Sequence, residues 1–505
     1  MNEPVGEQSR SISRTGVIAV LVFAALNVAV FFVRALSIWR YGSLFEVSGG
    51  ESQMIYSVWK QIHNVPVYQN PFTYPFSLTL YNYLFYESYA AFIRLVGAQG
   101  ADIVTWGRNF TPAFAVAGAI AQWRLIQDRL NLRRSLSLLS LFFAIGLWLS
   151  TSIVRYWALS IRPDVPAIAL AMIALWVIVR RPRFAFAYAG VLFYLAWSFK
   201  QSIVLIFVGV CLFLLFHKRW RDLTALVAFY AALIAITLWL GTPEYRFSVL
   251  VAPRLVTGFS LSHALPPAGR ALAGNVYWVL AFIPLLMAAG VRKADSTVRL
   301  LVTALAVALV GGVAAMTKAG AWDNYLLEAF VAGSTLLQIA VFSVPGRVVG
   351  ALVMLGCLQP AVQLATQPSG HVWRHGHNVF GTVGLATAQE YKEAVALNDQ
   401  LMRLKKPVFS SEEFYGLPWI SNDNRVPGLI IDHIFHDALR ARYVNGGVDG
   451  LLERGEIPTL VLQTGETQYL KSMNPKYKKV GEFVYCGAPF LVFELDQETP
   501  APAAQ

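Results

Sequence analysis

Long apolar runs separated by short polar segments make up most of this chain. The runs recur between positions 16 and 364, and a helix of about 20 apolar residues crosses a hydrocarbon core of about 30 Å. The pattern therefore predicts a polytopic α-helical membrane protein with about eleven transmembrane helices. The predicted spans are Gly16–Ile38, Ile103–Ile126, Ser135–Ile153, Val165–Val179, Phe184–Phe199, Ser202–Phe216, Leu223–Gly241, Asn275–Gly290, Leu300–Met316, Leu326–Phe342 and Val348–Leu364.

The long segment after the first span, Trp39–Ala101, contains two further helical patterns. Ser52–His63 places its apolar residues on one helical face. Phe76–Val96 is long enough to span, but it contains four tyrosines together with Glu87 and Arg94. Tyrosine favours the headgroup level of a membrane. We therefore expect Phe76–Val96 to lie in the interface rather than across the membrane.

Basic residues support this topology. If Phe76–Val96 does not span, every basic cluster of the membrane part lies on one side, as the positive-inside rule requires. The clusters are Arg124–Arg134, Arg180–Arg183, Lys218–Arg221, Arg292 with Lys293, and Arg347. The net charge of +12 is thereby explained without nucleic acid as a partner. We expect a multi-pass protein of the plasma membrane, the inner membrane in bacteria, with a cytoplasmic N-terminus.

The composition changes at Gln367, after which 13 Lys and Arg face 16 Asp and Glu. Helix-like and strand-like segments alternate there, which predicts a small α/β domain. The helix-like segments are Ala386–Lys405 and Leu429–Tyr443, and the strand-like ones are Pro407–Phe409, Thr459–Gln463, Lys479–Tyr485 and Phe490–Glu494. Eleven spans place this domain outside, in the periplasm of a bacterium. The expected organisation is a cytoplasmic tail (1–15), a transmembrane unit (16–366) with its outer loop (39–101), an extracytoplasmic α/β domain (367–498) and a disordered tail (499–505).

Charged residues at the ends of membrane helices are costly unless they have a role or reach water. Those predicted on the outer side are Glu51, Arg155, Arg162, Asp164, Lys200, Glu244, Arg246, Arg254, Arg270, Lys318 and Asp323. A few carboxylates and several cations on one face suit a reaction on a phosphate-bearing lipid.

Glu51 follows two glycines at the start of a predicted helix, where amide N–H groups and the helix dipole favour an anion. We expect it to be the catalytic base, and the alternative is a simple helix cap. Asp164 either caps the fourth span or takes part in the site, where it would bind acceptor, position a partner of Glu51 or ligate a cation. Lys200 either extends to the interface or meets a lipid phosphate.

Histidines raise the question of a metal. His371, His375, His377, His433 and His436 do not have the spacing of a closed zinc site. We therefore expect them to be solvated or hydrogen-bonded.

Several short motifs, in this order, resemble a known family. They are Gly50-Glu51, Asn64-Val65-Pro66-Val67-Tyr68, Tyr74-Pro75-Phe76, Arg162-Pro163-Asp164-Val165-Pro166 and Ser198-Phe199-Lys200-Gln201. Together they resemble GT-C fold membrane glycosyltransferases, in particular the bacterial branch of the protein O-mannosyltransferase and lipid A aminoarabinose transferase superfamily. The resemblance covers residues 16–216 well and is loose beyond them.

The resemblance implies an enzyme that transfers a sugar, with inversion, from a polyprenyl-phosphate-linked donor to a hydroxyl of a lipid, glycan or protein acceptor. Its site would open to the outer face, and membrane lipids would surround it. Glu51 and Asp164 would be catalytic, with Glu46 as an alternative base because many members carry Asp or Asp-Glu at this point. The residues expected to bind substrate or phosphate are Lys200, Arg162, Gln201, Arg254 and Tyr74. Some relatives use a divalent cation and others do not, so no metal is assigned.

Two other classes remain as alternatives. A lipid-linked glycan transporter or flippase would place charges in the middle of its spans, whereas the predicted spans are almost free of charge. A membrane sensor or scaffold would not need Glu51, Asp164 and Lys200 on one face.

Overall fold

The structure is a computed structural model. It describes residues 13–41, 44, 47–48, 50–74, 76, 78–151, 153–255, 259–275, 280, 295–318, 321–343, 347–365, 388–405, 408–410, 442–464, 473–485 and 488–496.

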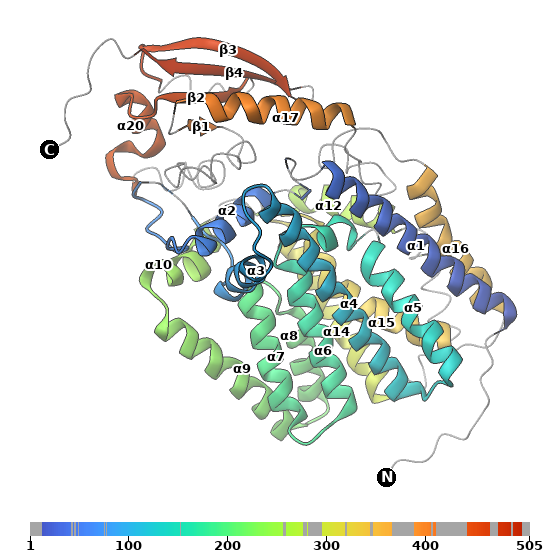
Figure 1. The fold of residues 1–505 in the computed structure, drawn as a ribbon. Coiled ribbons are helices and arrows are strands. Elements are labelled where there is room, and N and C mark those ends of the chain that lie inside the picture. Colours follow the sequence, from blue (N-terminus) through green and yellow to red (C-terminus); the bar gives the residue numbers. More distant parts are fainter. Residues whose placement is uncertain are drawn as a thin grey trace.

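Helices packed side by side form most of the described chain (Figure 1). The apolar helices of this bundle are α1 (Arg14–Tyr41), α4 (Asp102–Leu130), α5 (Arg134–Ser150), α6 (Asp164–Arg180), α7 (Ala185–Phe199), α8 (Leu205–Phe216), α9 (Trp220–Leu240), α14 (Ser296–Met316), α15 (Leu327–Ser343) and α16 (Arg347–Ala365). Helix α6 packs against both α4 and α7, α1 against both α5 and α16, and α14 against both α8 and α15.

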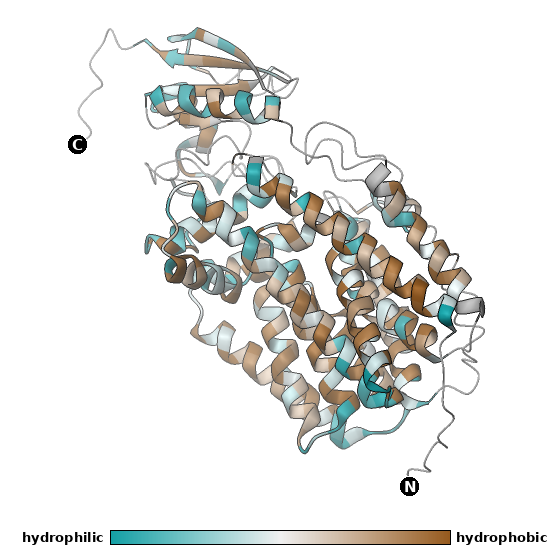
Figure 2. Ribbon diagram, turned by 45° about the vertical axis from the view of Figure 1, so that its right-hand side comes forward, coloured by the Kyte–Doolittle hydropathy of each residue, from teal (hydrophilic) through white to brown (hydrophobic). Residues whose placement is uncertain are grey.

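The helices are apolar enough for a membrane protein. Within the described residues, four stretches have the length and composition to cross a membrane: Arg14–Arg40, Trp220–Leu240, Ser296–Met316 and Asp323–Ser343. Shorter apolar helices pack among them. Figure 2 shows apolar residues along the bodies of the helices, with hydrophilic residues gathered towards their ends, whereas the C-terminal sheet carries both kinds.

Ten of the eleven predicted spans coincide with described helices to within a few residues. The eighth, Asn275–Gly290, lies almost entirely outside the described residues, so the number of crossings stays a prediction. The basic ends of α4 and α6 both meet the start of α14. Arg129 Nε lies 2.9 Å from Asp295 Oδ2, and Arg181 Nη2 donates to Ser296 Oγ at 3.4 Å. These two basic clusters therefore lie at one end of the bundle, as the positive-inside argument requires.

Two short helices of the predicted first outer loop, α2 (Glu51–Ile62) and α3 (Tyr83–Val96), pack on each other at the opposite end. Helix α2 carries the predicted apolar face of Ser52–His63, and all its residues from Glu51 to Lys60, polar ones included, are buried. The first part of the predicted helix Phe76–Val96 is not helical, because α3 begins only at Tyr83.

Tertiary hydrogen bonds explain the late start of α3. Asn82, the residue before the helix, has an extended backbone and is completely buried. Its amide nitrogen donates to the Trp197 carbonyl at 2.5 Å, and its amide oxygen accepts from the Tyr245 hydroxyl at 2.7 Å. These bonds attach the segment before α3 to α7 and α10 (Pro243–Arg246).

The segment 242–274, which lies between the predicted spans Leu223–Gly241 and Asn275–Gly290, is largely helical. It contains α10, a π-helical turn η3 (Phe247–Val251), α11 (Ala252–Leu255) and α12 (Leu261–Gly274). Helix α12 includes Pro266 and Pro267. Proline inside a sequence pattern normally argues against a helix, so this element was missed.

A four-stranded sheet lies beyond the membrane helices (Figure 1). Its order is β1 (Val408–Ser410), β2 (Thr459–Gln463), β4 (Ala488–Leu495) and β3 (Tyr477–Tyr485), with β1 parallel to β2 and the other pairs antiparallel. Helices α17 (Ala388–Arg403) and α20 (Gly447–Arg454) accompany it.

The four predicted strands and the helix within Ala386–Lys405 are therefore present. The predicted helix Leu429–Tyr443 lies almost wholly outside the described residues, and the domain boundaries stay a prediction. The segment before α20 meets the loop between α2 and α3, because the Val444 amide donates to the Phe72 carbonyl at 2.9 Å and the rings of Phe72 and Tyr443 lie 5.6 Å apart.

Candidate active site

Asp164 is the first residue of α6 and is completely buried. Its Oδ1 accepts from Lys200 Nζ at 2.5 Å and from Asn324 Nδ2 at 2.8 Å, and its Oδ2 accepts from Arg162 Nε at 3.3 Å. The donors come from the turn before α6, the end of α7 and the 3-10 turn η5 (Asp323–Leu326) before α15. The structure thus brings Lys200 and Asn324, which are 36 and 160 positions away, to the Arg162-Pro163-Asp164 turn.

Lys200 directly follows the last residue of α7, and its extended backbone ends that helix. Its side chain is only 4% exposed. Burial lowers the pKa of the Lys200 amine, but the neighbouring carboxylate of Asp164 raises it, and the net direction is upward from the ordinary value of 10.5. Lys200 is therefore a buried cation at neutral pH.

Aromatic rings surround the two cations. Lys200 Nζ lies 5.8 Å from the ring centre of Tyr81 and 5.6 Å from that of Tyr325. The guanidinium of Arg162 lies 4.9 Å from the ring of Trp157, and its Nη2 donates to the Tyr81 hydroxyl at 3.1 Å. Because the face of an aromatic ring is electronegative, these rings favour cations that burial would otherwise make costly.

Glu51, the expected base, is completely buried and fully engaged. Arg108 binds it with both ends of its guanidinium, through Nε to Oε1 at 2.9 Å and Nη2 to Oε2 at 2.7 Å. The backbone amides of Val47 and Ile161 add bonds of 2.8 Å to Oε2 and 2.7 Å to Oε1. A carboxylate offers about four acceptor sites, so this arrangement uses all of them.

The bond from Ile161 connects Glu51 to the Asp164 cluster. Ile161 directly precedes Arg162, so Glu51 holds the backbone that carries Arg162 and Asp164. Gly50, directly before Glu51, lies close to the same segment. Its φ is +73°, and a Cβ at this position would lie 3.5 Å from Arg162 Nη1. Glycine adopts this left-handed conformation at little cost, which explains why the residue before Glu51 is a glycine.

The other expected residues occupy different places. Gln201 Nε2 donates to the Leu80 carbonyl at 2.6 Å, which anchors the residue next to Tyr81. Arg254 is exposed on α11, and none of the described contacts joins it to Asp164. Tyr74 is 45% exposed, and its ring contacts that of Phe76. Glu46 lies outside the described residues.

Sequence reasoning missed Arg108, Asn324, Tyr81 and Tyr325. Arg108 had a usable signal, because it is a charge inside the predicted span Ile103–Ile126 and such charges are usually paired or functional. Asn324, Tyr81 and Tyr325 gave no such signal in the sequence, because neutral polar residues near helix ends are common.

Metal binding stays open. Among the residues that the structure describes, no three His, Cys, Asp or Glu side chains are grouped so that they could hold a metal ion. The five histidines considered above lie outside the described residues.

Comparison with known proteins identifies the fold. No family model matches the chain, and no curated protein matches its sequence. Among solved structures it is similar to ArnT from Cupriavidus metallidurans bound to undecaprenyl phosphate, with a TM-score of 0.60 and 12% identity over 94% of this chain and 99% of ArnT. The apo state of ArnT gives 0.60 and 12% over 92% and 97%. A weaker match is the Archaeoglobus fulgidus oligosaccharyltransferase in complex with Zn and sulfate, at 0.46 and 14% over 94% and 72%.

The chain therefore has the fold of ArnT, a GT-C membrane protein. This confirms, at the level of the fold, the resemblance to GT-C glycosyltransferases that the sequence motifs indicated. At 12% identity the similarity says nothing of the roles of individual residues, so those depend on the geometry described above.

Proposed function

We propose that this protein is a glycosyltransferase that moves a sugar, hexose or pentose, from a polyprenyl-phosphate-linked donor to an acceptor hydroxyl at the outer face of the plasma membrane. One observation carries the proposal. Two buried cations, Arg162 and Lys200, converge on one buried carboxylate, Asp164, in a chain with the fold of ArnT. ArnT was solved with undecaprenyl phosphate bound, and two cations beside one carboxylate suit a phosphate-bearing substrate.

The reaction would proceed as follows. The acceptor oxygen attacks the anomeric carbon of the donor sugar, and the bond from that carbon to the phosphate oxygen breaks. The electron pair of the broken bond goes to the phosphate, which gains negative charge, and the acceptor hydroxyl loses its proton to a carboxylate. Lys200 and Arg162 would stabilise the charge on the leaving phosphate, since fixed cations in a buried site act strongly on developing charge.

Two carboxylates are candidates for the base. A base needs a lone pair within hydrogen-bond reach of the acceptor hydroxyl. Glu51 accepts four hydrogen bonds over its two oxygens, whereas Asp164 accepts three described bonds, two on Oδ1 and one on Oδ2. The arrangement therefore favours Asp164 as the base and Glu51 as a positioning residue that holds the Arg162–Asp164 segment.

The test is transfer of radiolabelled sugar from undecaprenyl-phosphate-linked hexoses and pentoses, with membranes of the source cells as acceptor. We expect Asp164→Asn and Lys200→Met to lose about 100-fold or more in rate, the scale of losing a transition-state contact. Lys479→Gln, in the exposed Lys479–Glu482 pair of β3, is the matched control and should transfer normally. Lipid-linked glycan crossing the membrane without any transfer would identify a flippase instead and overturn the proposal.

A further inference from the structure

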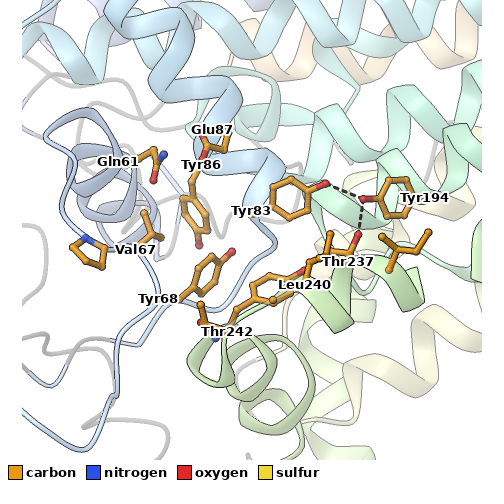
Figure 3. A pocket seen from close by; sticks show the side chains of 14 residues that line it. Gln61, Val67, Tyr68, Tyr83, Tyr86, Glu87, Tyr194, Thr237, Leu240 and Thr242 are labelled. Carbon is orange, nitrogen blue, oxygen red and sulfur yellow. Dashed lines mark hydrogen bonds between the residues drawn. The ribbon is translucent and has the colours of Figure 1, made fainter. Parts of the chain in front are cut away.

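A cavity of about 580 Å³ lies beside the cluster and is rich in tyrosine (Figure 3). It is open to one side and is lined by residues of α2, α3, the loop between them, α7, α9 and α10. The lining contains five tyrosines: Tyr68, Tyr83, Tyr86, Tyr194 and Tyr245. Its volume is within the range of small-molecule sites, about 300–1,000 Å³.

The cavity offers hydroxyl groups in an ordered row. The hydroxyls of Tyr83 and Tyr194 lie 2.8 Å apart, and the Tyr194 hydroxyl lies 2.7 Å from Thr237 Oγ1 (Figure 3). Burial, followed by the bond to Tyr194, raises the pKa of Tyr83 to about 12. Tyr83 therefore stays protonated at neutral pH. Thr237 Oγ1 donates to the Leu233 carbonyl at 2.9 Å, so the hydroxyl protons of the row are used within it and its oxygens offer lone pairs to the hydroxyl groups of a ligand.

The charge of the lining is distinctive. Among the described residues that line the cavity, Glu87 is the one charged side chain, and no Lys, Arg or His is present. Phosphate would find no cation here. Tyrosine rings, hydroxyls, the Gln61 amide and one carboxylate instead suit a ligand with apolar C–H faces and many hydroxyl groups.

Tyr81 links two tyrosines of this cavity to the Asp164 cluster through hydrogen bonds. Its carbonyl accepts from the Tyr68 hydroxyl at 2.7 Å, and its amide donates to the Tyr86 hydroxyl at 3.3 Å. Its own hydroxyl accepts from Arg162. One residue is thus held by two tyrosines of the cavity while its side chain meets a cation of the cluster.

We propose that the tyrosine-lined cavity is the acceptor subsite and that it binds a neutral, hydroxyl-rich saccharide. The assignment rests on the proposed function. In this arrangement the two substrates occupy sites of different charge. The phosphate of the donor lies on the Lys200 side of Tyr81, and the uncharged glycan lies on the other side. Glu87 selects against acidic sugars by repulsion.

The test measures binding rather than turnover. Saturation-transfer NMR is recorded on the protein in lipid nanodiscs, which avoids sugar detergents, with the methyl glycosides of glucose, mannose, galactose and glucuronic acid as probes. We expect at least one neutral glycoside to bind and the glucuronide to bind more weakly. Gln61→Trp, which fills the cavity, should reduce that signal about tenfold or more, a loss of about 1.4 kcal/mol. Leu95→Trp, at a position of α3 that is 82% exposed, is the matched control and should leave the signal unchanged.

A competition experiment distinguishes whether the cavity binds the sugar of the acceptor or the sugar of the donor. Undecaprenyl-phosphate-linked hexoses should not displace the glycoside any more than undecaprenyl phosphate does. Displacement by the sugar-bearing lipid alone would assign the cavity to the sugar of the donor and overturn the acceptor assignment. Absence of glycoside binding, or equal binding to Gln61→Trp, would overturn the subsite. Either result leaves the transferase assay as a separate test of the proposed function.

Discussion

Arg108 and Glu51, 57 positions apart, form a bidentate ion pair in which both side chains are almost completely buried, at 1% and 0% exposure. The pair connects α4 to the start of α2, and through the Ile161 amide it reaches the segment that carries Asp164. Glu51, which the sequence predicted to be the base, thus makes the contacts that the proposed positioning role requires.

Neutralising Glu51 tests that role. In Glu51→Gln the guanidinium of Arg108 stays buried without an anionic partner, and breaking a buried pair costs about 3–5 kcal/mol. We expect a clearly lower unfolding temperature in detergent together with reduced transfer. Arg108→Gln should behave similarly, and the double variant should be more stable than the sum of the two single losses predicts.

A different result would support the prediction from the sequence that Glu51 is the catalytic base. If Glu51→Gln keeps the unfolding temperature of the wild type and still abolishes transfer, Glu51 is the base and the positioning role is wrong.

The burial of Lys60 predicts that the stability of the folded protein depends on pH. Lys60 is buried in α2, with Nζ 4.7 Å from the ring centre of Tyr56, and burial lowers its pKa from 10.5 to about 7. Between pH 7 and 10.5 the unfolded chain binds this proton and the folded protein does not, so stability rises with pH in that window. We expect the free energy of unfolding to increase by up to a few kcal/mol from pH 7 to pH 10.

The measurement is the unfolding temperature of the wild type and of Lys60→Met across this range. Methionine cannot titrate, so the variant should lack the part of the slope that Lys60 contributes. Parallel curves for the two proteins would show that Lys60 keeps an ordinary pKa.

The topology is open to a direct test. Leu130, at the end of α4 beside Arg129, belongs to the basic end of the bundle, which the positive-inside rule places in the cytoplasm. A cysteine there, in a background with Cys211, Cys357 and Cys486 replaced by serine, should resist a membrane-impermeant maleimide in intact cells and react after lysis. Leu95→Cys on α3, at the opposite end, should react in intact cells. Labelling of position 130 from outside would overturn the eleven-span topology.

Much of the fold is encoded locally. Runs of apolar residues determine where helices form, since a span must satisfy its own backbone within the membrane, and ten of the predicted spans recur as helices. Basic clusters indicated which helix ends lie together. The same reasoning placed Arg162, Asp164 and Lys200 on one face, and the structure joins them in one cluster.

Other features depend on packing between distant parts of the chain. The partners of Glu51 and Asp164 include Arg108 and Asn324, which lie 57 and 160 positions away. No local pattern specifies such pairs, because they depend on how helices pack. For the same reason the sequence predicted a helix where Asn82 is held extended by α7 and α10, and it held no sign of the tyrosine-lined cavity. The sequence by itself determined which residues are apolar, charged and near one membrane face. Only the tertiary structure decided that Glu51 is held by Arg108, because a buried carboxylate takes its role from the donors that surround it.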